Sequence, residues 1–504
     1  MRASYVVLAG LSFDYNFKKA LIMNDTMLID TNNAEKALGD AQAEFISARE
    51  AEDIADQALD DADTIDRISD TLESRIHGAT AEEVEMAQIA VEAICNRLGI
   101  AKPKPVALEN YRDRTTRPDA TALAVEALKE IGETIWKYVL KIYRKIKEWL
   151  KKGYKYLFDG KQNLLKRARA LEALVEKLEG EPKESVIKGS FIKALTFKDH
   201  FSDQNVIAAT KQIAINAKLA GALVDGIDKS EAQLKAIVDI TKKAVASADN
   251  DKTRADAAER NRAYAQATGQ QGVDSQIEDV LKPIAVMLEF TVKSIADNQE
   301  LELLTSGKDK NKAALVPKSA PAINRMPGYV GLTEEKLQAL KKLTNIKPGT
   351  TLAVLQEVEA VVKGMRADFI ETSDKINEDF KAKTLDTGAM SQIVSNCIDG
   401  LEEAENYDKN IRKLTDFMQK AERLIEAAAN SKSSIKNKDV SKAVKMAMRI
   451  NTKFTQVQAG AFAACYRHLL DTARYSLDYV AQSAKQYKGG SMFGGGSSDE
   501  DDEE

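Results

Sequence analysis

Cysteine, histidine and aromatic residues are scarce in this sequence. Among 504 residues there are three cysteines and three histidines, and aromatic residues make up 6%. Cys95, Cys397 and Cys465 lie far apart and no CxxC pair occurs, so neither a disulfide framework nor a zinc site is expected. We expect all three cysteines to be buried, because a free cysteine usually packs as a small apolar side chain.

Recognisable catalytic motifs are also missing. No GxxxxGK[ST], GxGxxG, GxSxG or HExxH pattern occurs. His77, His200 and His468 stand alone, without the spacing of metal ligands. His200 follows Asp199, a carboxylate that could orient it, and a hydrolase acting through His200 is the enzymatic alternative that this leaves. Because no constellation surrounds it, we predict a protein that is not an enzyme, with no catalytic, cofactor-binding or metal-binding residues and no cofactor.

Long hydrophobic runs are absent as well. Lys or Glu interrupts each apolar stretch before the roughly 18 residues that a transmembrane helix requires. The first 17 residues contain a short apolar run but no small-x-small cleavage site, so secretion is not expected. Met23 opens a stretch that reads like an ordinary protein start, and we expect it to be the true start, with residues 1–22 as translated leader.

Residues that favour α-helices dominate the composition. Hydrophobic residues make up 44% and charged residues 30% of the chain, and nine prolines interrupt it. Runs of β-branched residues are scarce, while Ala, Glu, Lys and Leu abound. We therefore predict an all-α fold of long-helix bundles, coiled-coil-like in part, with a flexible acidic C-terminal tail.

Prolines, glycines and shifts in charge divide the chain into predicted segments. The linkers are assigned from clusters such as Pro103, Pro105 and Pro118, and the tail from its Gly/Ser run before six acidic residues. The predicted division is a leader at 1–32, an acidic helical segment at 33–101, a linker with basic Trp/Lys-rich helices at 102–182, a helical domain at 183–305, a Pro/Lys-rich linker at 306–331, a C-terminal helical bundle at 332–488, and the tail at 489–504.

Strong negative charge marks the first predicted helix, from about Asn33 to Arg75. It holds 13 acidic and 4 basic residues, a net charge of −9, beside a thin apolar stripe at helical spacing. A second helix is expected from Ala81 to Leu98, because Thr80 and Glu83 have the spacing of a capping box. Further on, helices are expected at about 119–158, 162–178, 277–304, 333–343, 351–382, 389–429 and 440–488.

Positive charge is concentrated between residues 135 and 155, in a segment that also contains both tryptophans of the chain. From Lys137 to Lys155 there are eight basic residues and one acidic residue, a net charge of +7. Apolar residues from Ile131 to Leu150 recur on one stripe at helical spacing. The candidate contact residues for a nucleic acid or a membrane are Trp136, Lys137, Lys141, Arg144, Lys145, Lys147, Trp149, Lys151, Lys152, Lys155, Lys166, Arg167 and Arg169.

Three interpretations of this basic amphipathic segment remain open. It can lie in a membrane surface with its aromatic residues among the head groups. It can bind the phosphates of a nucleic acid without reading their sequence. In the third interpretation the apolar stripe joins the protein core while the lysines stay solvated, with the acidic segment at 33–75 as a partner for part of the charge.

A resemblance covers residues 110–195. The order of features is NYRDRTT at 110–116, an Ala/Val/Glu-rich helix entering the Trp/Lys-rich run at 131–158, the basic LLKRARAL at 164–171, GEPKE at 180–184, and IKGSFIKAL at 187–195. In this order and character the segment resembles the internal head proteins of tailed bacteriophages. The resemblance implies a virion structural protein held inside the capsid beside the packaged genome, and present in the host cytoplasm during assembly.

Two functions are therefore expected, in order of preference. The first is a structural protein of the phage head that binds packaged double-stranded DNA non-specifically and leaves the capsid with it. Its expected partners are the DNA, other virion head proteins, further copies of itself through the C-terminal helices and, after ejection, the host inner membrane. The alternative is a peripheral, membrane-associating or membrane-perturbing helical protein that acts through the 131–158 helix.

Overall fold

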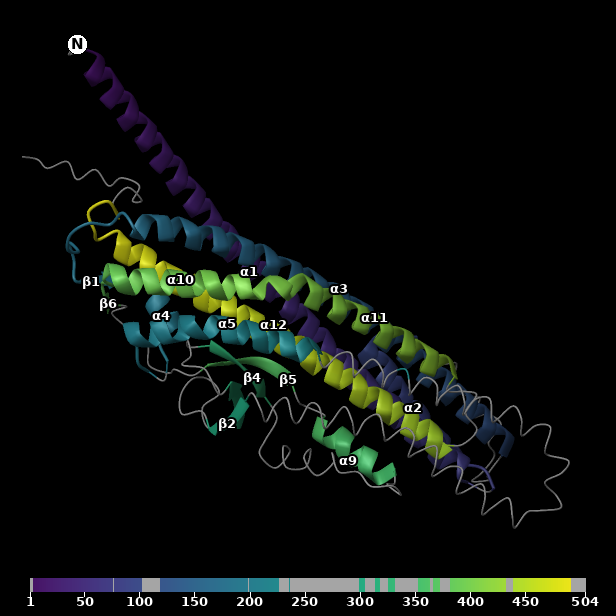
Figure 1. Cartoon of the computed structure of the whole chain (residues 1–504). Coiled ribbons are helices and arrows are strands. Elements are labelled where there is room, and N and C mark those ends of the chain that lie inside the picture. Colours follow the sequence, from purple (N-terminus) through teal and green to yellow (C-terminus); the bar gives the residue numbers. More distant parts are fainter. Residues whose placement is uncertain are drawn as a thin grey trace, which may run out of the picture.

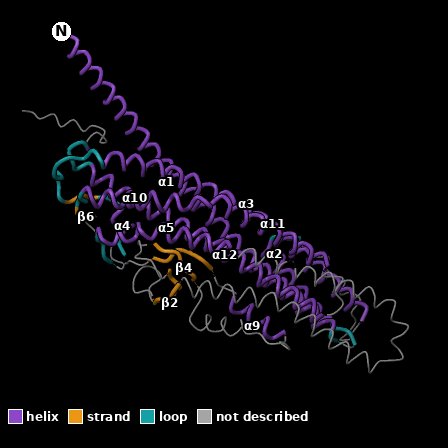
Figure 2. The backbone as a smooth tube through the Cα atoms, viewed as in Figure 1, coloured by secondary structure: helices purple, strands orange, loops and turns teal. Residues whose placement is uncertain are grey.

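A computed structural model describes most of the chain and confirms the predicted all-α class, with a small amount of sheet. The described residues are 3–75, 77–101, 118–197, 199–225, 235, 299–303, 313–317, 325–330, 352–362, 366–371, 381–431 and 438–490. Long helices lie side by side along one axis, and the short strands gather beside the bundle (Figures 1 and 2). The linker at 102–117 and the tail from residue 491 lie outside the described residues, and the predicted domain division stays a prediction.

The two longest helices form the centre of the bundle. Helix α1 (Ala3–Glu73) and helix α3 (Pro118–Val175) pack along each other in antiparallel directions. Buried alanines recur every seven residues on the side of α1 that faces the core, so the helix axes can approach closely. These residues, all at most 1% exposed, are Ala34, Ala41, Ala48, Ala55 and Ala62.

Glycines of α3 complete this close contact. A Cβ atom on Gly153 would stand 2.9 Å from the Phe45 ring, and one on Gly160 would stand 3.4 Å from Leu38. The two glycines are seven residues apart and so lie on one face of the helix. The sequence predicted a helix end near Phe158 and a new helix from Gln162, and that prediction was wrong because Gly160 serves packing within one continuous helix.

Four further helices complete the bundle. They are α5 (Asp203–Asp225), α10 (Thr387–Glu403), α11 (Tyr407–Ser431) and α12 (Lys438–Ala484). Helix α3 contacts α10, α11 and α12 as well as α1. The predicted helix at 389–429 is divided at the 3₁₀ turn η3 (Ala404–Asn406).

Aromatic rings fasten α3 to α11 and α12. The Tyr407 and Tyr466 rings stack with their centroids 3.8 Å apart, and Phe462 lies edge-on to Tyr154 at 5.6 Å. The Tyr154 hydroxyl donates to the Ala459 carbonyl at 3.0 Å, and the Tyr407 hydroxyl donates to the Tyr154 carbonyl at 2.9 Å. Both phenol groups are buried with their donors satisfied, which fixes the rotation of α3 about its axis.

Helix α2 (Ala81–Leu98) confirms the predicted capping box. The Thr80 hydroxyl accepts from the Glu83 amide, and the Glu83 carboxylate accepts from the Thr80 amide. Gly99 ends the helix with φ at 64°, a conformation that costs glycine little. Helix α1, by contrast, begins at Ala3, so the start predicted near Asn33 is wrong.

Strands occupy three places where the sequence predicted helices or a linker. Strands β2 (Gln299–Leu303), β3 (Ala313–Pro317), β4 (Arg325–Val330) and β5 (Arg366–Glu371) form an antiparallel sheet in the order β2-β3-β4-β5. They fall at the end of the predicted 277–304 helix, within the 306–331 linker, and within the predicted 351–382 helix, of which α9 (Leu352–Val362) remains.

A smaller ribbon ties distant parts of the chain together. Strand β1 (Val186–Lys188) pairs antiparallel with β6 (Lys381–Lys383). The short helix α4 (Phe191–Leu195) follows β1 and buries its apolar residues against α12.

The predictions about cysteine and about membrane spans can also be checked. All three cysteines are free and buried, as predicted, and burial raises the pKa of the Cys465 thiol to about 12. Burial likewise raises the pKa of Cys397, so neither is a thiolate at neutral pH. Among the helices of the described part of the chain, none combines the length and hydropathy needed to cross a bilayer.

Candidate nucleic-acid interface

The basic amphipathic segment lies in the middle of α3, with its apolar stripe turned into the bundle. The stripe belongs to the buried core of the bundle. Its buried members, each at most 7% exposed, are Ile131, Ile135, Val139, Ile142, Ile146 and Leu150. The exposed side of α3, which borders α11, carries the lysines.

Neither tryptophan stands free at the surface. Trp136 is 4% exposed, and Trp149 is half-buried against the core. Burial of Trp136 puts its indole out of reach of a lipid surface in the folded protein. It therefore contributes to packing and cannot belong to the contact surface for which the sequence proposed it.

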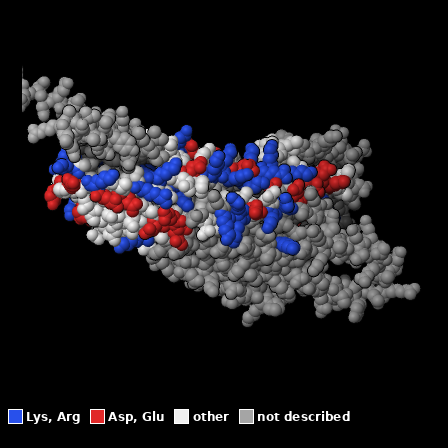
Figure 3. Space-filling view, turned by 45° about the horizontal axis from the view of Figure 1, so that its top comes forward, with Lys and Arg blue, Asp and Glu red and all other residues white. Residues whose placement is uncertain are grey.

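Four lysines form a line along the exposed side of α3. Lys137, Lys141, Lys151 and Lys155 are exposed and form no ion pair with any residue that the structure describes. At 100° per residue all four lie within about 80° around the axis, and they extend over roughly 27 Å along it. We call these four residues the outer lysine row. Figure 3 shows many basic side chains, with acidic ones among them, on one face of the bundle.

Two other basic residues of α3 bind α11 instead. The Glu422 carboxylate accepts from Arg144 at 2.6 Å and from Lys147 at 2.7 Å, and Arg144 also lies 3.7 Å from Glu426. Partial burial acts to raise the pKa of Glu422, but the hydrogen bonds and charges of Lys147 and Arg144 outweigh it and lower that pKa. These pairs join α11 to α3 and neutralise part of the basic charge of α3.

The remaining predicted contact residues fall into several environments. Arg167 is buried and forms an ion pair with Asp478 at 2.7 Å, so it is structural. Arg169 is exposed but lies 2.7 Å from Glu402 of α10. Lys166 and Lys145 are exposed, with no ion pair to a described residue. Lys152 lies 4.0 Å from Glu44 of α1.

The acidic helix α1 finds its main counter-charges on α12. Residues spaced by multiples of seven along one side of α1 meet basic residues of α12 in antiparallel order. Glu35 pairs with Arg474, Gln42 accepts from Arg467 at 2.7 Å, Asp56 pairs with Lys453 at 2.6 Å, and Asp63 pairs with Arg449. We call this set the α1–α12 ladder.

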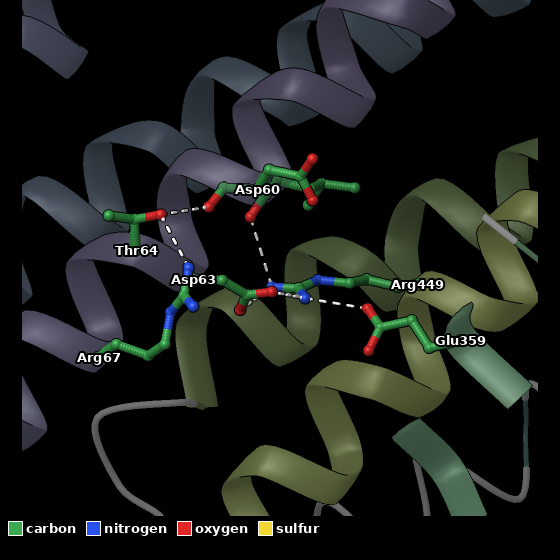
Figure 4. Close-up of polar contacts among 7 residues, drawn as sticks. Asp60, Asp63, Thr64, Arg67, Glu359 and Arg449 are labelled. Atoms are coloured by element: carbon green, nitrogen blue, oxygen red, sulfur yellow. Dashed lines mark hydrogen bonds and ion pairs between the residues drawn. The ribbon is translucent and has the colours of Figure 1, made fainter. Parts of the chain in front are cut away.

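Arg449 is the most enclosed member of the ladder (Figure 4). Its guanidinium contacts both oxygens of Asp63 and lies 3.0 Å from Glu359 of α9. Burial acts to lower the pKa of Arg449, but the hydrogen bonds and charges of Asp63 and Glu359 raise it. Three segments far apart in sequence thus meet at one cation.

The acidic and basic segments neutralise each other only slightly. Among the described residues, the ion pairs between α1 and α3 are Glu44 with Lys152 and Glu73 with Lys129 at 2.7 Å. Other acidic residues of α1 pair with α12, through Glu35, Asp56 and Asp63, or with α2, through Asp61 and Arg97. The outer lysine row keeps its charge for the solvent.

Sequence reasoning missed a second group of cations beside this row. Lys409, Arg412 and Arg423 are exposed on α11, which packs along α3. Their spacing of three and eleven residues puts them on one face of a helix, so periodicity alone could have found them. They widen the basic surface, although Glu422 and Glu426 interrupt it.

The histidines form no site in the described part of the chain. His77 and His200 are exposed, and His468 is buried within α12. His200 closes a tight turn in which its backbone exchanges hydrogen bonds with Phe197 at 2.8 and 2.9 Å. No group of His, Cys, Asp and Glu suited to a metal ion occurs among the described residues.

The fold and this surface define a helical structural protein whose most distinctive feature is a separation of charge between neighbouring helices. Comparison with known families matches residues 40–482 to the phiKZ-like phage internal head proteins. The match spans most of the chain, and the protein belongs to this family. It is therefore a bacteriophage structural protein that lies inside the virion capsid, in agreement with the resemblance found at 110–195. No curated protein and no solved structure matches the chain.

Proposed function

We propose that this protein binds packaged double-stranded DNA inside the capsid, without sequence preference, through the outer lysine row of α3. The observation that carries the proposal is the exposure of Lys137, Lys141, Lys151 and Lys155 on one side of a rigid helix, without ion pairs to described residues. An ammonium group is a point charge that binds phosphate oxygens and reads no base.

The number of lysines sets the expected dependence on salt. Each phosphate neutralised on a duplex releases condensed counterions, so the slope of log K against log salt is about −0.9 per contact. Four contacts give a slope of about −3.6, which means that affinity falls about 10²-fold between 50 and 200 mM salt. The neighbouring cations of α11 would steepen this slope.

Burial of the apolar stripe favours DNA over a membrane as the target. To insert as an interfacial helix, the 131–158 segment would have to withdraw six buried aliphatic side chains from the bundle. At roughly 1.5–3 kcal/mol for each side chain, the cost is on the order of 10 kcal/mol. The exposed side of α3 offers charge to a head group but little apolar surface to the lipid.

The rest of the proposed role follows from the place of the family in the virion. A bundle with a cationic side can lie against DNA or between DNA and other head proteins, which are the further partners we expect. We propose that this role is structural, without an enzymatic step, and that the protein can leave the capsid together with the DNA.

The test compares two variants of the full chain that lose the same charge. In the first, the outer row is changed as K137Q/K141Q/K151Q/K155Q. In the second, four exposed lysines elsewhere are changed as K177Q/K188Q/K193Q/K211Q. Fluorescence anisotropy with a labelled 30-base-pair duplex, titrated between 50 and 200 mM salt, gives affinity and salt slope for each.

We expect the outer-row variant to lose at least about 10²-fold in affinity at 50 mM salt and most of its salt slope, while the matched variant keeps both. Equal losses in the two variants would reduce the effect to net charge and contradict the proposal. Binding to anionic vesicles that persists at 200 mM salt, without binding to the duplex, would favour the membrane alternative.

A further inference from the structure

One stretch of α1 presents apolar and acidic side chains outward together. Ile46 and Ile54 are each 47% exposed, and Glu50 lies midway between them on the same side of the helix. Asp53 is exposed beside them. We call these four residues the α1 stripe.

The α1 stripe differs from the other acidic side of the same helix. Glu35, Asp56 and Asp63 face α12 and are neutralised by its arginines and lysine. Glu50 and Asp53 form no ion pair with a described residue. Two half-exposed isoleucines that flank unneutralised carboxylates are a suitable surface for a basic partner with apolar content.

The complementary surface lies on the neighbouring helix of the same molecule. Lys145, Trp149 and Lys152 follow at spacings of four and three, so they lie on one face of α3. Lys152 lies near Glu44 of α1, so this face of α3 is the one next to α1. We call Lys145, Trp149 and Lys152 the α3 stripe, with an indole partly exposed between two ammonium groups.

The two stripes lie at the same level of the bundle. Gly153 of α3 packs against Phe45 of α1, and the helices run in opposite directions. Residues 46–54 of α1 therefore lie beside residues 145–152 of α3. Figure 1 shows α1 and α3 side by side. An acidic, apolar stripe and a basic, aromatic stripe thus lie on adjacent helices.

We propose that this surface binds a second copy of the chain about a two-fold axis parallel to the bundle. Such a rotation places the α1 stripe of each copy over the α3 stripe of the other, at the same level. It repeats between chains the antiparallel pairing that α1 and α3 already make within one chain. The pairing is reciprocal, as a two-fold interface requires.

Charge complementarity selects a second copy as the occupant. A generic acidic partner would be repelled by Glu50 and Asp53, and a generic basic partner by Lys145 and Lys152. The acidic α1 stripe needs a basic stripe opposite it, and the basic α3 stripe beside it needs an acidic one. A second copy of the chain carries both stripes in the order that meets these two requirements together. The proposal is independent of DNA binding, because the outer lysine row lies to one side of the α3 stripe.

The experiment uses charge reversal and mixing. Three variants of the full chain are prepared: E50K/D53K, K145E/K152E, and the combination of all four changes. A fourth variant, E85K/E82K, reverses two exposed acidic residues of α2 and serves as the matched control. Sedimentation velocity at 50 mM salt gives the mass of each protein alone and of equimolar mixtures, and circular dichroism checks that each is folded.

We expect the wild type and the α2 control to be dimers. The two double variants should each dimerise at least about 10-fold more weakly, since like charges then face one another in both halves of the interface. Mixing the two double variants should restore a heterodimer, because both halves again join opposite charges, and the fourfold variant should dimerise by itself.

A wild type that is monomeric at 50 mM salt would overturn the proposal. So would a failure of the mixed double variants to associate when each is folded. Loss of duplex binding in the outer-row variant with an unchanged dimer would separate this interface from the proposed DNA surface.

Discussion

Helices α1 and α3 are the two longest elements of the protein, and they use charge in opposite ways. Both are amphipathic and each buries one side against the other. The acidic residues of α1 that face α12 are held in the α1–α12 ladder. The outer lysines of α3 are exposed and form no ion pair with a described residue.

The difference shows that charge density alone does not separate a structural surface from a binding surface. The segment at 33–75 carries a net charge of −9 and the segment at 137–155 carries +7. What distinguishes them is the third helix. Since α12 supplies Arg449, Lys453 and Arg474 to three acidic residues of α1, those charges serve the fold, whereas the outer lysine row of α3 is left for a partner.

The change R449M removes a cation from the α1–α12 ladder and should lower the stability of the protein more than the other changes considered below. It leaves Asp63 and Glu359 facing one another without their shared cation. Breaking a buried pair costs about 3–5 kcal/mol, and because these carboxylates keep some exposure we expect about 2–4 kcal/mol of lost stability. Urea denaturation of the full chain measures it.

The companion variant D63N/R449M tests the cause of that loss. Removing one of the two carboxylates should return part of the stability, because less repulsion remains. A loss below about 0.5 kcal/mol in R449M would contradict a structural role for the ladder, since that is the range of ordinary surface changes.

The change E52Q should raise the stability of the protein, by an amount that depends on pH. Burial raises the pKa of Glu52 from 4.5 to about 7, with Asp56 and Asp53 adding to the rise and Lys453 and Arg49 opposing it. The folded state therefore binds a proton that the unfolded state has released between pH 4.5 and 7. The contribution of Glu52 to stability therefore falls as pH rises through that window and is level above it.

Glutamine mimics the protonated form at every pH. We expect E52Q to stabilise the protein by about 1–3 kcal/mol at pH 8 and to have no effect near pH 4. Urea denaturation at the two pH values measures the difference. A stabilisation that is the same at both would point to packing instead of ionisation.

Sequence periodicity predicted the long helices well, since a long segment with an apolar stripe at helical spacing and charged residues elsewhere fits few structures other than an amphipathic helix. The capping box at Thr80 and the helix from 440 were found for this reason, and so was the basic amphipathic face of α3. It failed at Gly160 and at residues 299–330. The glycine at 160 leaves room for a side chain of the neighbouring helix, and nothing in the local sequence indicates this. Short strands whose hydrogen bonds go to residues farther along the chain likewise leave no local pattern.

The sequence predicted the candidate site only in part. Spacing identified all the lysines of the outer row, but it could not tell Arg167, which is buried against Asp478, from Lys166 beside it. Nor could it show that Glu422, more than 270 residues away, takes up Arg144 and Lys147. Which charges are neutralised depends on tertiary neighbours, and these are known only after folding.

The smallest expected effect is a change in stability when the outer lysine row of α3 is neutralised. Lys137 and Lys141, and likewise Lys151 and Lys155, are like charges four residues apart on the helix surface, a spacing that destabilises a helix by roughly 0.2–0.5 kcal/mol per pair. The variant K137Q/K141Q/K151Q/K155Q should therefore gain about 0.4–1 kcal/mol at 50 mM salt, and the gain should shrink at 500 mM, where the repulsion is screened. Urea denaturation at both salt concentrations measures it, with K177Q/K188Q/K193Q/K211Q as the matched control. A loss of stability in the first variant would mean that these lysines support the fold, as the acidic residues of α1 do, and the contrast between the two helices would then fail.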